Sequence, residues 1–540
     1  MKKFRLLLIL IVLNTVFSPH LNAQYTLTIE DIELGTNGVI HDYYGNKKDI
    51  IIPPLFHVNG RDIKVRYIAI GAFYNMSLTS VILPKGLISI GERAFSRNRI
   101  TSIKIPNSVL EIGEDSFSYN KLKELTISNQ VTNIRSRTFQ VNKLTNVDLP
   151  PKLRRIGFCA FSDNNLEHIT IPEEVETIGA NAFRNNEIAT LHLSYNIKKI
   201  GDGAFHSNKL VTLKIPHNIK RIGNALFSYN EIETIIFPDS LISIGELAFQ
   251  HNKMTTVNIP PSVKYIKSKA FQSNVLTHIT LPDSLKMLSS SAFSFNQLSE
   301  VEIPSKLTFL ADNVFAHNKI TRLTIPENIT VIYEEAFENN AIKELSLPNY
   351  LKYIDESAFA DNQIKSLIIP NSVVHIGKSA FTRNRIETLI LSDKLKVISN
   401  WSFHANFIKS VVIPQSVKHI GEYAFYENQL HHVTLPDSVV VFEEGCFLDN
   451  KIEELKIPHR TQNIGKIAFS FNKLKSVIIP SSVHFIGRKA FRKNELRSVI
   501  IENHNTKVDS TAFYENPQLK KIKRNHHYNL QTIPLKFHLP

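Results

Sequence analysis

Cysteine is almost absent from the sequence, since Cys159 and Cys446 are the only two in 540 residues. Small secreted domains are often held together by several disulfides. A framework of that kind is excluded here, so packing and hydrogen bonds must stabilise the fold.

Long hydrophobic runs are also missing, except near the N-terminus. Three cations, Lys2, Lys3 and Arg5, precede an apolar run at residues 6–13, and the small residue Ala23 precedes Gln24. This pattern predicts a signal peptide at residues 1–23, with a buried N-terminal helix as the alternative. The run is too short to span a bilayer, so we expect no transmembrane segment in the mature chain. Cleavage would lower the formal net charge from +14 to 14 − 3 = +11.

Known catalytic and nucleotide-binding motifs are also missing. The sequence has no P-loop, no dinucleotide-binding glycine pattern, no Gly-x-Ser-x-Gly and no His-Glu-x-x-His. His168 and His192 are predicted to lie diagonally on adjacent strands, but no carboxylate or thiolate completes a metal site. We therefore predict no enzyme activity, no cofactor and no metal.

A strict repeat is what the sequence does contain. Phenylalanine recurs every 22 residues from Phe73 to Phe513, 21 times in all, and asparagine follows three residues after each of the last 20. A fixed period of this length predicts a solenoid, in which each coil stacks on the next. The two cysteines would then lie 13 coils apart, roughly 60 Å at one strand spacing per coil, so they cannot form a disulfide with each other.

Positions within one repeat are counted from its phenylalanine, which is position zero. Aliphatic residues stand at −5, +8 and +10, and proline follows at +11 in 16 of 20 copies. This pattern predicts a short strand at +7 to +10. Glycine at −4, as in Gly91, suits a left-handed or crowded turn, and we expect the Gly-x-x-Ala-Phe segment to form a short helical or 3₁₀ turn. The sequence thus predicts about 21 coils, one strand in each, and a single parallel sheet capped at both ends.

The asparagine at +3 is the most regular polar position. A polar side chain at an inward position needs hydrogen-bond partners, and a stacked amide can both donate to and accept from the backbone of the adjacent coil. We therefore predict a structural ladder, with a row of ligand-binding amides as the alternative. In the first copies it comprises Asn98, Asn120, Asn142, Asn164, Asn186, Asn208 and Asn230.

These residues together carry a family resemblance. The stretch from Ile171-Pro172 through Ile178-Gly179 and Ala182-Phe183 to Asn186 resembles the unit of BspA-like leucine-rich repeats. The resemblance covers about residues 60–520, and it departs from the usual unit in having asparagine for cysteine and one residue fewer. It implies a leucine-rich-repeat solenoid that is secreted or displayed on the cell surface. It also implies an adhesin-like role in binding host proteins or cells. The predicted signal peptide also allows a periplasmic location.

The predicted domain organisation follows from the register of the repeat. We expect a signal peptide at residues 1–23, an N-terminal cap at 24–67, the solenoid at 68–516, and a C-terminal cap with a basic tail at 517–540. Atypical terminal coils of this kind shield the core of a solenoid from solvent and from edge pairing.

The outward face of the predicted sheet is the first candidate for recognition. Positions +7 and +9 flank the inward +8, and +9 is aliphatic in three successive coils, which predicts an exposed apolar stripe. Ordinary strand propensity is the alternative explanation. The candidate partner-binding residues are Thr190, His192, Thr212, Lys214, Arg322, Ile368, Ile390 and Val412.

A column of cations at +4 is the second candidate. Stacking would turn it into a basic ridge able to hold an acidic glycan, or it could be a solvated turn that keeps the stack soluble. No aromatic residues alternate with it, so nucleic acid is not expected. The ridge comprises Arg99, Lys121, Lys143, Lys209, Lys253, Lys319, Arg385, Lys451 and Lys473.

The leading interpretation is an exported, non-enzymatic repeat protein that binds a protein partner through its sheet face. An electrostatic binder of acidic glycans and a passive envelope protein are the alternatives. The sequence does not indicate the identity of the partner or the oligomeric state.

Overall fold

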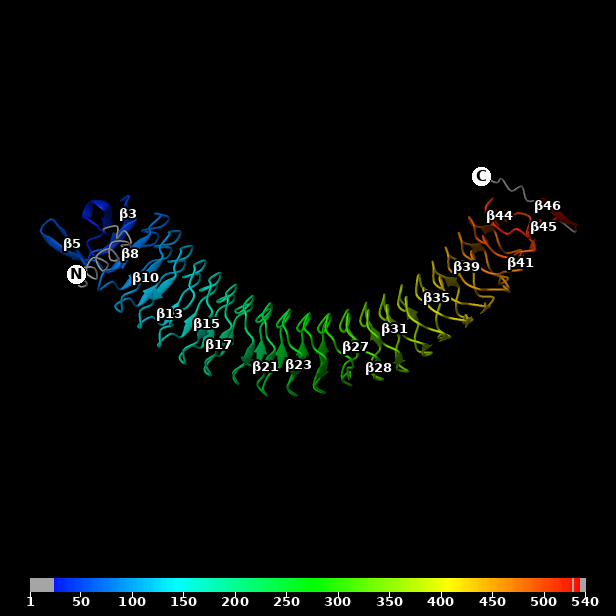
Figure 1. Ribbon diagram of the computed structural model, residues 1–540, viewed down its shortest axis with the longest axis horizontal. Coiled ribbons are helices and arrows are strands. Elements are labelled where there is room, and N and C mark those ends of the chain that lie inside the picture. The colour runs from blue at the N-terminus through cyan, green and yellow to red at the C-terminus, as the bar shows by residue number, and fades with distance from the viewer. Residues whose placement is uncertain (1–23, 527–528, 535–540) are drawn as a thin grey trace, which may run out of the picture. The chain divides into compact units, whose positions relative to one another are not determined.

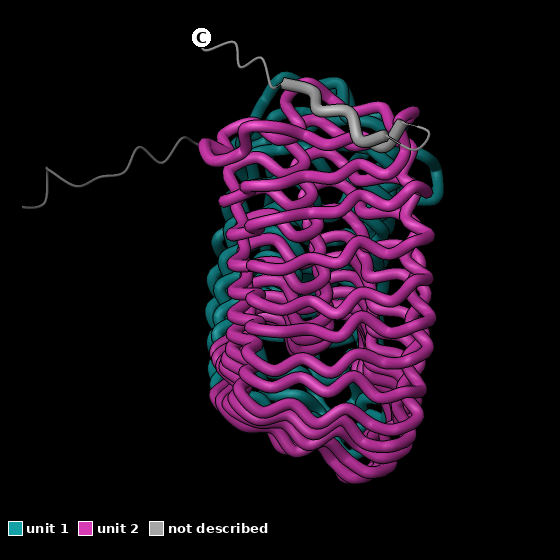
Figure 2. The backbone as a smooth tube through the Cα atoms, turned by 90° about the vertical axis from the view of Figure 1, so that its right-hand side faces the viewer, with its two compact units in different colours: residues 1–238 teal, residues 239–540 magenta. Residues whose placement is uncertain are grey.

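The computed structural model describes residues 24–526 and 529–534, so the predicted signal peptide lies outside the described residues. The chain divides into two compact units, Met1–Pro238 and Asp239–Pro540, which Figure 2 distinguishes by colour. In each unit the chain winds into coils about 22 residues apart, about 23 turns in total. The structure confirms the predicted solenoid (Figure 1).

Most full coils contain two strands, whereas the sequence predicts one. We call the strands at +7 to +9 the first ladder and the strands at −6 and −5 the second ladder. Strands of successive coils pair in parallel and in register, as Ser366 pairs with Thr388 in the first ladder and Tyr353 with His375 in the second.

The first ladder of Met1–Pro238 contains β8 (Ser80–Ile82), β10 (Ser102–Lys104), β12 (Glu124–Thr126), β15 (His168–Thr170), β17 (Thr190–His192), β19 (Thr212–Lys214) and β21 (Thr234–Ile236). Its second ladder contains β7 (Tyr67–Ile68), β9 (Ser89–Ile90), β11 (Glu111–Ile112), β13 (Asn133–Ile134), β14 (Arg155–Ile156), β16 (Thr177–Ile178), β18 (Lys199–Ile200) and β20 (Arg221–Ile222).

The first ladder of Asp239–Pro540 contains β23 (Thr256–Asn258), β25 (His278–Thr280), β28 (Arg322–Thr324), β30 (Glu344–Ser346), β32 (Ser366–Ile368), β34 (Thr388–Ile390), β36 (Ser410–Val412), β38 (His432–Thr434), β41 (Ser476–Ile479) and β43 (Ser498–Ile501). Its second ladder contains β22 (Ser243–Ile244), β24 (Tyr265–Ile266), β26 (Met287–Leu288), β27 (Phe309–Leu310), β29 (Val331–Ile332), β31 (Tyr353–Ile354), β33 (His375–Ile376), β35 (Val397–Ile398), β37 (His419–Ile420), β39 (Val441–Phe442), β40 (Asn463–Ile464), β42 (Phe485–Ile486) and β44 (Lys507–Val508).

The Gly-x-x-Ala-Phe segment forms hydrogen-bonded turns in place of the expected helical turn. The reason is a residue with positive φ at −2 and another at +2, such as Arg93 (φ 53) and Arg97 (φ 59), because a left-handed residue interrupts any helix. The left-handed positions serve the stacking, since Arg93 N–H donates to Glu114 O of the next coil (2.8 Å) and Arg97 N–H to Ser118 O (2.9 Å). Within the described residues the only helical element is the 3₁₀ turn η1 (Ile29–Asp31).

Glycine at −4 is explained by crowding and not by a left-handed backbone. A Cβ on Gly179 would lie 2.6 Å from the carbonyl carbon of Gly157 in the preceding coil, and its φ is not in the left-handed region. The absence of a side chain therefore allows two coil backbones to approach closely.

Phenylalanine rings stack from coil to coil at the centre of each unit. Neighbouring rings are parallel and offset, as with Phe161 and Phe183, whose centroids are 5.5 Å apart at an interplanar angle of 4°. At the N-terminal end Tyr43 continues the stack, 5.3 Å from Phe73. The Tyr43 hydroxyl donates a hydrogen bond to Lys47 O at 2.9 Å, so the polar atom of this terminal ring has a partner.

The residues before the first full coil contribute further strands. They are β1 (Tyr25–Thr26), β2 (Ile32–Leu34), β3 (Val39–Tyr43), β4 (Asp49–Ile51), β5 (Leu55–Val58) and β6 (Arg61–Lys64). β1 and β4 extend the first ladder through β8, and β3 extends the second ladder through β7. At the other end β45 (Lys521–His526) pairs in parallel with β43 and in antiparallel with β46 (Asn529–Pro534). The boundaries of the two caps stay predictions.

Both cysteines are buried free thiols. Cys446 replaces the usual alanine before a core phenylalanine and is fully enclosed. Burial raises the pKa of the Cys446 thiol well above its ordinary value, which keeps it protonated and unreactive.

Candidate partner-binding surface

The first ladder presents a regular outward face. In most of these strands the residue at +8 is buried or half-buried while those at +7 and +9 are exposed, as in β34, where Leu389 is buried between Thr388 and Ile390. Side chains on a strand alternate between faces, so every coil offers two side chains to solvent at the same height. The face can therefore be read as two parallel columns of side chains.

An apolar stripe occupies the +9 column of three successive coils in Asp239–Pro540. The exposed fractions are 61 % for Ile368, 53 % for Ile390 and 65 % for Val412, and Ile368 pairs directly with Ile390. Large aliphatic side chains that remain this exposed on neighbouring strands form a contiguous apolar surface.

The surroundings of the stripe are polar but uncharged along these three strands. The +7 column beside it holds only hydroxyl side chains, Ser366, Thr388 and Ser410. The next coil towards the N-terminus carries Glu344, which forms an ion pair with Arg322 at 2.8 Å. The three strands of the stripe thus present no charged side chain at +7 or +9, and the ion pair Arg322–Glu344 lies in the two coils that precede them.

Four other predicted sheet-face residues lie on the first ladder of Met1–Pro238. Thr190 and His192 belong to β17, and Thr212 and Lys214 belong to β19; all four are exposed. The register places His168 opposite Thr190, so His168 and His192 are diagonal, as predicted from sequence. No group of three or more metal-binding side chains occurs among the described residues.

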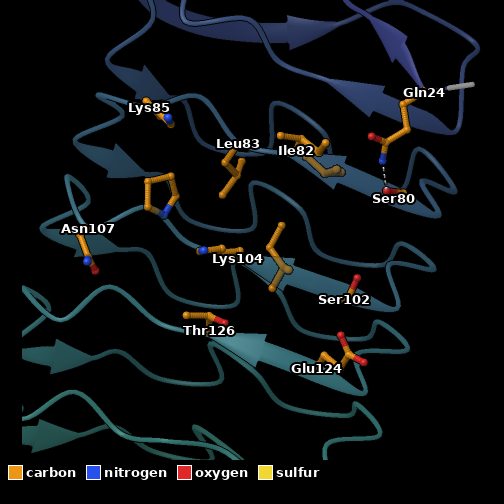
Figure 3. A pocket seen from close by; sticks show the side chains of 13 residues that line it. Gln24, Ser80, Ile82, Leu83, Lys85, Ser102, Lys104, Asn107, Glu124 and Thr126 are labelled. Atoms are coloured by element: carbon orange, nitrogen blue, oxygen red, sulfur yellow. Dashed lines mark hydrogen bonds between the residues drawn. The ribbon is translucent and has the colours of Figure 1, made fainter.

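A hollow of about 710 Å³ lies on the first-ladder face near the N-terminal end of Met1–Pro238 (Figure 3). Gln24 closes one side of it, and the Gln24 Nε2 donates to Ser80 Oγ at 2.7 Å. The floor carries Lys104 and Glu124 from adjacent strands. The sequence does not predict this hollow, because its border is formed by a residue from outside the repeat.

The asparagine column connects each coil to the one before it. The Nδ2 of Asn98 donates to the carbonyls of Phe95 (3.0 Å) and Phe73 (2.8 Å), while its Oδ1 accepts from the N–H of Leu78 (2.9 Å). The same three contacts recur for Asn120, Asn142, Asn164, Asn186, Asn208 and Asn230. Each amide is buried and fully occupied by backbone partners, so it is not available to a ligand.

The predicted ridge at +4 is interrupted in the sequence by Glu187, Glu231 and Glu495, and two of its lysines have side-chain partners in the structure. Arg99, Lys121 and Lys143 follow one another on adjacent coils and are exposed. Further along, Lys209 forms an ion pair with Glu187, and the Lys319 ammonium donates to Gln297 Oε1 at 3.1 Å. The remaining predicted members, Lys253, Arg385, Lys451 and Lys473, are separated by other residue types or stand in short runs.

No helix within the described residues is long and apolar enough to cross a membrane. No curated protein matches the sequence. Structural similarity extends to YopM from Yersinia enterocolitica, with 21 % identity, 84 % of this chain and 90 % of that chain covered, and a TM-score of 0.43. It extends also to a leucine-rich repeat protein from Bacteroides ovatus, with 21 % identity, 72 % and 87 % covered, and a TM-score of 0.40.

A third similar structure is a leucine-rich cell surface protein from Faecalibacterium prausnitzii, with 19 % identity, 92 % and 93 % covered, and a TM-score of 0.27. The family model described as the BspA type leucine-rich repeat region matches six times, at residues 62–167, 112–232, 156–275, 221–343, 330–452 and 442–535. These matches run through most of the chain and coincide with the coils, so the protein belongs to the BspA-type leucine-rich repeat family.

Proposed function

We propose that the protein is an exported, non-enzymatic scaffold that binds a protein partner through the first-ladder face, in the manner of an adhesin. The observation that carries this proposal is the exposed stripe of Ile368, Ile390 and Val412. Leucine-rich repeat proteins are usually protein-binding scaffolds, and the sequence of residues 1–23 supports export. A location on the cell surface is part of the proposal.

The stripe suits a protein surface better than a polyanion. Three aliphatic side chains flanked by hydroxyls offer desolvation and neutral hydrogen bonds but no charge to attract sulfate or carboxylate. Interface cores are typically depleted of charge in this way, while charged groups lie at the rim. The Arg322–Glu344 pair stands at such a rim.

Replacing Ile390 with lysine is expected to weaken binding of the protein partner by at least tenfold, because an ammonium would have to be buried at the centre of the contact. The measurement is the dissociation constant for a partner found on an array of surface and matrix proteins, with wild-type and variant chains compared.

Ile236 provides a matched control, since it occupies the same +9 position with an exposed fraction of 62 % but lies outside the stripe. Ile236→Lys adds the same charge and should leave the affinity within about twofold of wild type. Equal loss in the two variants, or no loss in either, would count against the stripe as the contact.

A further inference from the structure

The second ladder of Met1–Pro238 carries a dense group of cations. Its two outward positions, −7 and −6, hold paired basic residues in three coils: Arg154-Arg155, Lys198-Lys199 and Lys220-Arg221. All six side chains are exposed. The coil between the first two pairs carries Glu176 and Thr177 at the same positions. We call the six cations the second-ladder patch.

The strand register fixes how these cations are arranged. Arg155 pairs with Thr177, and Thr177 pairs with Lys199, so Arg155 and Lys199 lie two coils apart in one column. Neighbouring strands are about 4.8 Å apart, which puts roughly 10 Å between these two positions. Arg221 follows one coil later in β20. The patch is therefore a short double row of positive charge that is interrupted at the coil of Glu176 and Thr177.

Five of the six cations form no ion pair and no side-chain hydrogen bond within the described residues. Lys198 forms an ion pair with Glu176 at 3.0 Å, and Lys198, Arg154 and Arg155 together lower the pKa of the Glu176 carboxyl. Arg154, Arg155, Lys199, Lys220 and Arg221 make no ion pair or side-chain hydrogen bond with any described residue. Other cations do pair with acids one coil away, as in Lys409–Glu387 (3.0 Å) and Lys475–Glu453 (3.1 Å).

Cations at both −7 and −6 of one coil occur only in Met1–Pro238. In Asp239–Pro540 the −7 position still carries lysine in five coils, but the −6 position beside these lysines holds Tyr265, Met287, Tyr353, Val397 and His419. The doubled row of cations is therefore a local feature of the first unit and does not follow from the repeat itself. Unneutralised like charges held side by side repel one another, and a bound polyanion would remove this cost.

We propose that the second-ladder patch binds a linear acidic polysaccharide, with carboxylate or sulfate groups on the six cations. The double row, with cations at the same two positions of coils one or two steps apart, matches an extended chain that carries charges at intervals, and the predicted export of the protein favours a glycan over nucleic acid. This site shares no residue with the first-ladder face, so it does not depend on the protein-binding proposal.

The test uses the mature chain with dextran sulfate and alginate as sulfated and carboxylated probes, and neutral dextran as the uncharged control. Binding to the two acidic polymers, absent with dextran, should weaken as salt rises. The double variant Lys199→Glu/Arg221→Glu is expected to lower the affinity by about tenfold or more. Both side chains are exposed, and circular dichroism would verify that the fold is retained.

Charge reversal on the +4 ridge provides the matched control. Lys121→Glu/Lys143→Glu makes the same change in net charge on two adjacent coils of the same unit and should leave binding within about twofold. Loss in this control equal to that in the patch variant would place the site on the ridge and overturn the inference. So would tighter binding to duplex DNA or to phosphatidylserine vesicles than to either acidic polymer, or no binding to the polymers at low salt. An unchanged affinity of the Ile390→Lys chain for the polymers would show that the two surfaces act separately.

Discussion

Replacing Phe359 with alanine is expected to lower the free energy of unfolding by about 4 kcal/mol. Phe359 is fully buried, and its ring stacks on Phe337 at 5.5 Å and on Phe381 at 5.4 Å. Alanine would leave a cavity between two rings that are held at fixed heights by their own coils, so the gap cannot close easily. Denaturant unfolding followed by circular dichroism measures the change.

Phe407 offers a control with the same chemistry, because it is 44 % exposed at position +4. Phe407→Ala should cost less than about 1 kcal/mol. Since solenoids do not always unfold in one step, the two variants should be compared at the same transition. Equal losses would contradict the account of a continuous aromatic core.

Replacing Asn164 with alanine is expected to destabilise the protein by about 3 kcal/mol. The side chain donates to the carbonyls of Phe139 (3.0 Å) and Phe161 (3.1 Å) and accepts from the N–H of Leu144 (3.2 Å). Its removal leaves a buried N–H unsatisfied and two carbonyls each one partner short, and an unpaired buried polar group costs about 1–3 kcal/mol. Thermal and denaturant unfolding both report the loss.

Asn165 is the adjacent control, since it is exposed at +4 and its side chain makes none of these contacts. Asn165→Ala should change stability by no more than about 0.5 kcal/mol. A stable Asn164→Ala chain would show that the ladder is dispensable, and the stacking would then have to rest on the strands and the phenylalanine core.

The coil itself could be predicted from the sequence because its signals repeat. A period of 22 residues, an aliphatic residue at +8 and an asparagine at +3 each recur about twenty times, so chance variation in one coil does not obscure them. The strand at +7 to +9 and its outward columns follow from the alternation of side chains. The exposed stripe at Ile368, Ile390 and Val412 lies on such a column.

The second strand could not be predicted by the same rule. It is two residues long, as in β18 (Lys199–Ile200), and only the isoleucine at −5 is apolar. Two residues do not establish an alternation. The sequence pattern therefore does not mark its cations as one surface, although basic pairs at 154–155, 198–199 and 220–221 recur in phase with the repeat.

The positive φ at −2 could not be predicted from the sequence, for a different reason. Glycine normally indicates a positive φ, but here the position at −2 is held by Cys159, Leu247 and Trp401 among others. Hydrogen bonds from these residues to the next coil stabilise the conformation, as Cys159 N–H donates to Ala180 O at 3.0 Å. The stacking of coils, and not the local sequence, determines the backbone there.

The most direct test of the central claim is the affinity of mature residues 24–540 for arrayed surface proteins and acidic glycans at low and at high salt. The account predicts a protein partner whose binding survives high salt, because apolar contacts are not screened, and is lost in Ile390→Lys but kept in Ile236→Lys. Binding to acidic glycans alone, vanishing as salt is raised, would contradict a protein-binding first-ladder face. Binding to nothing on the array would favour a passive envelope protein.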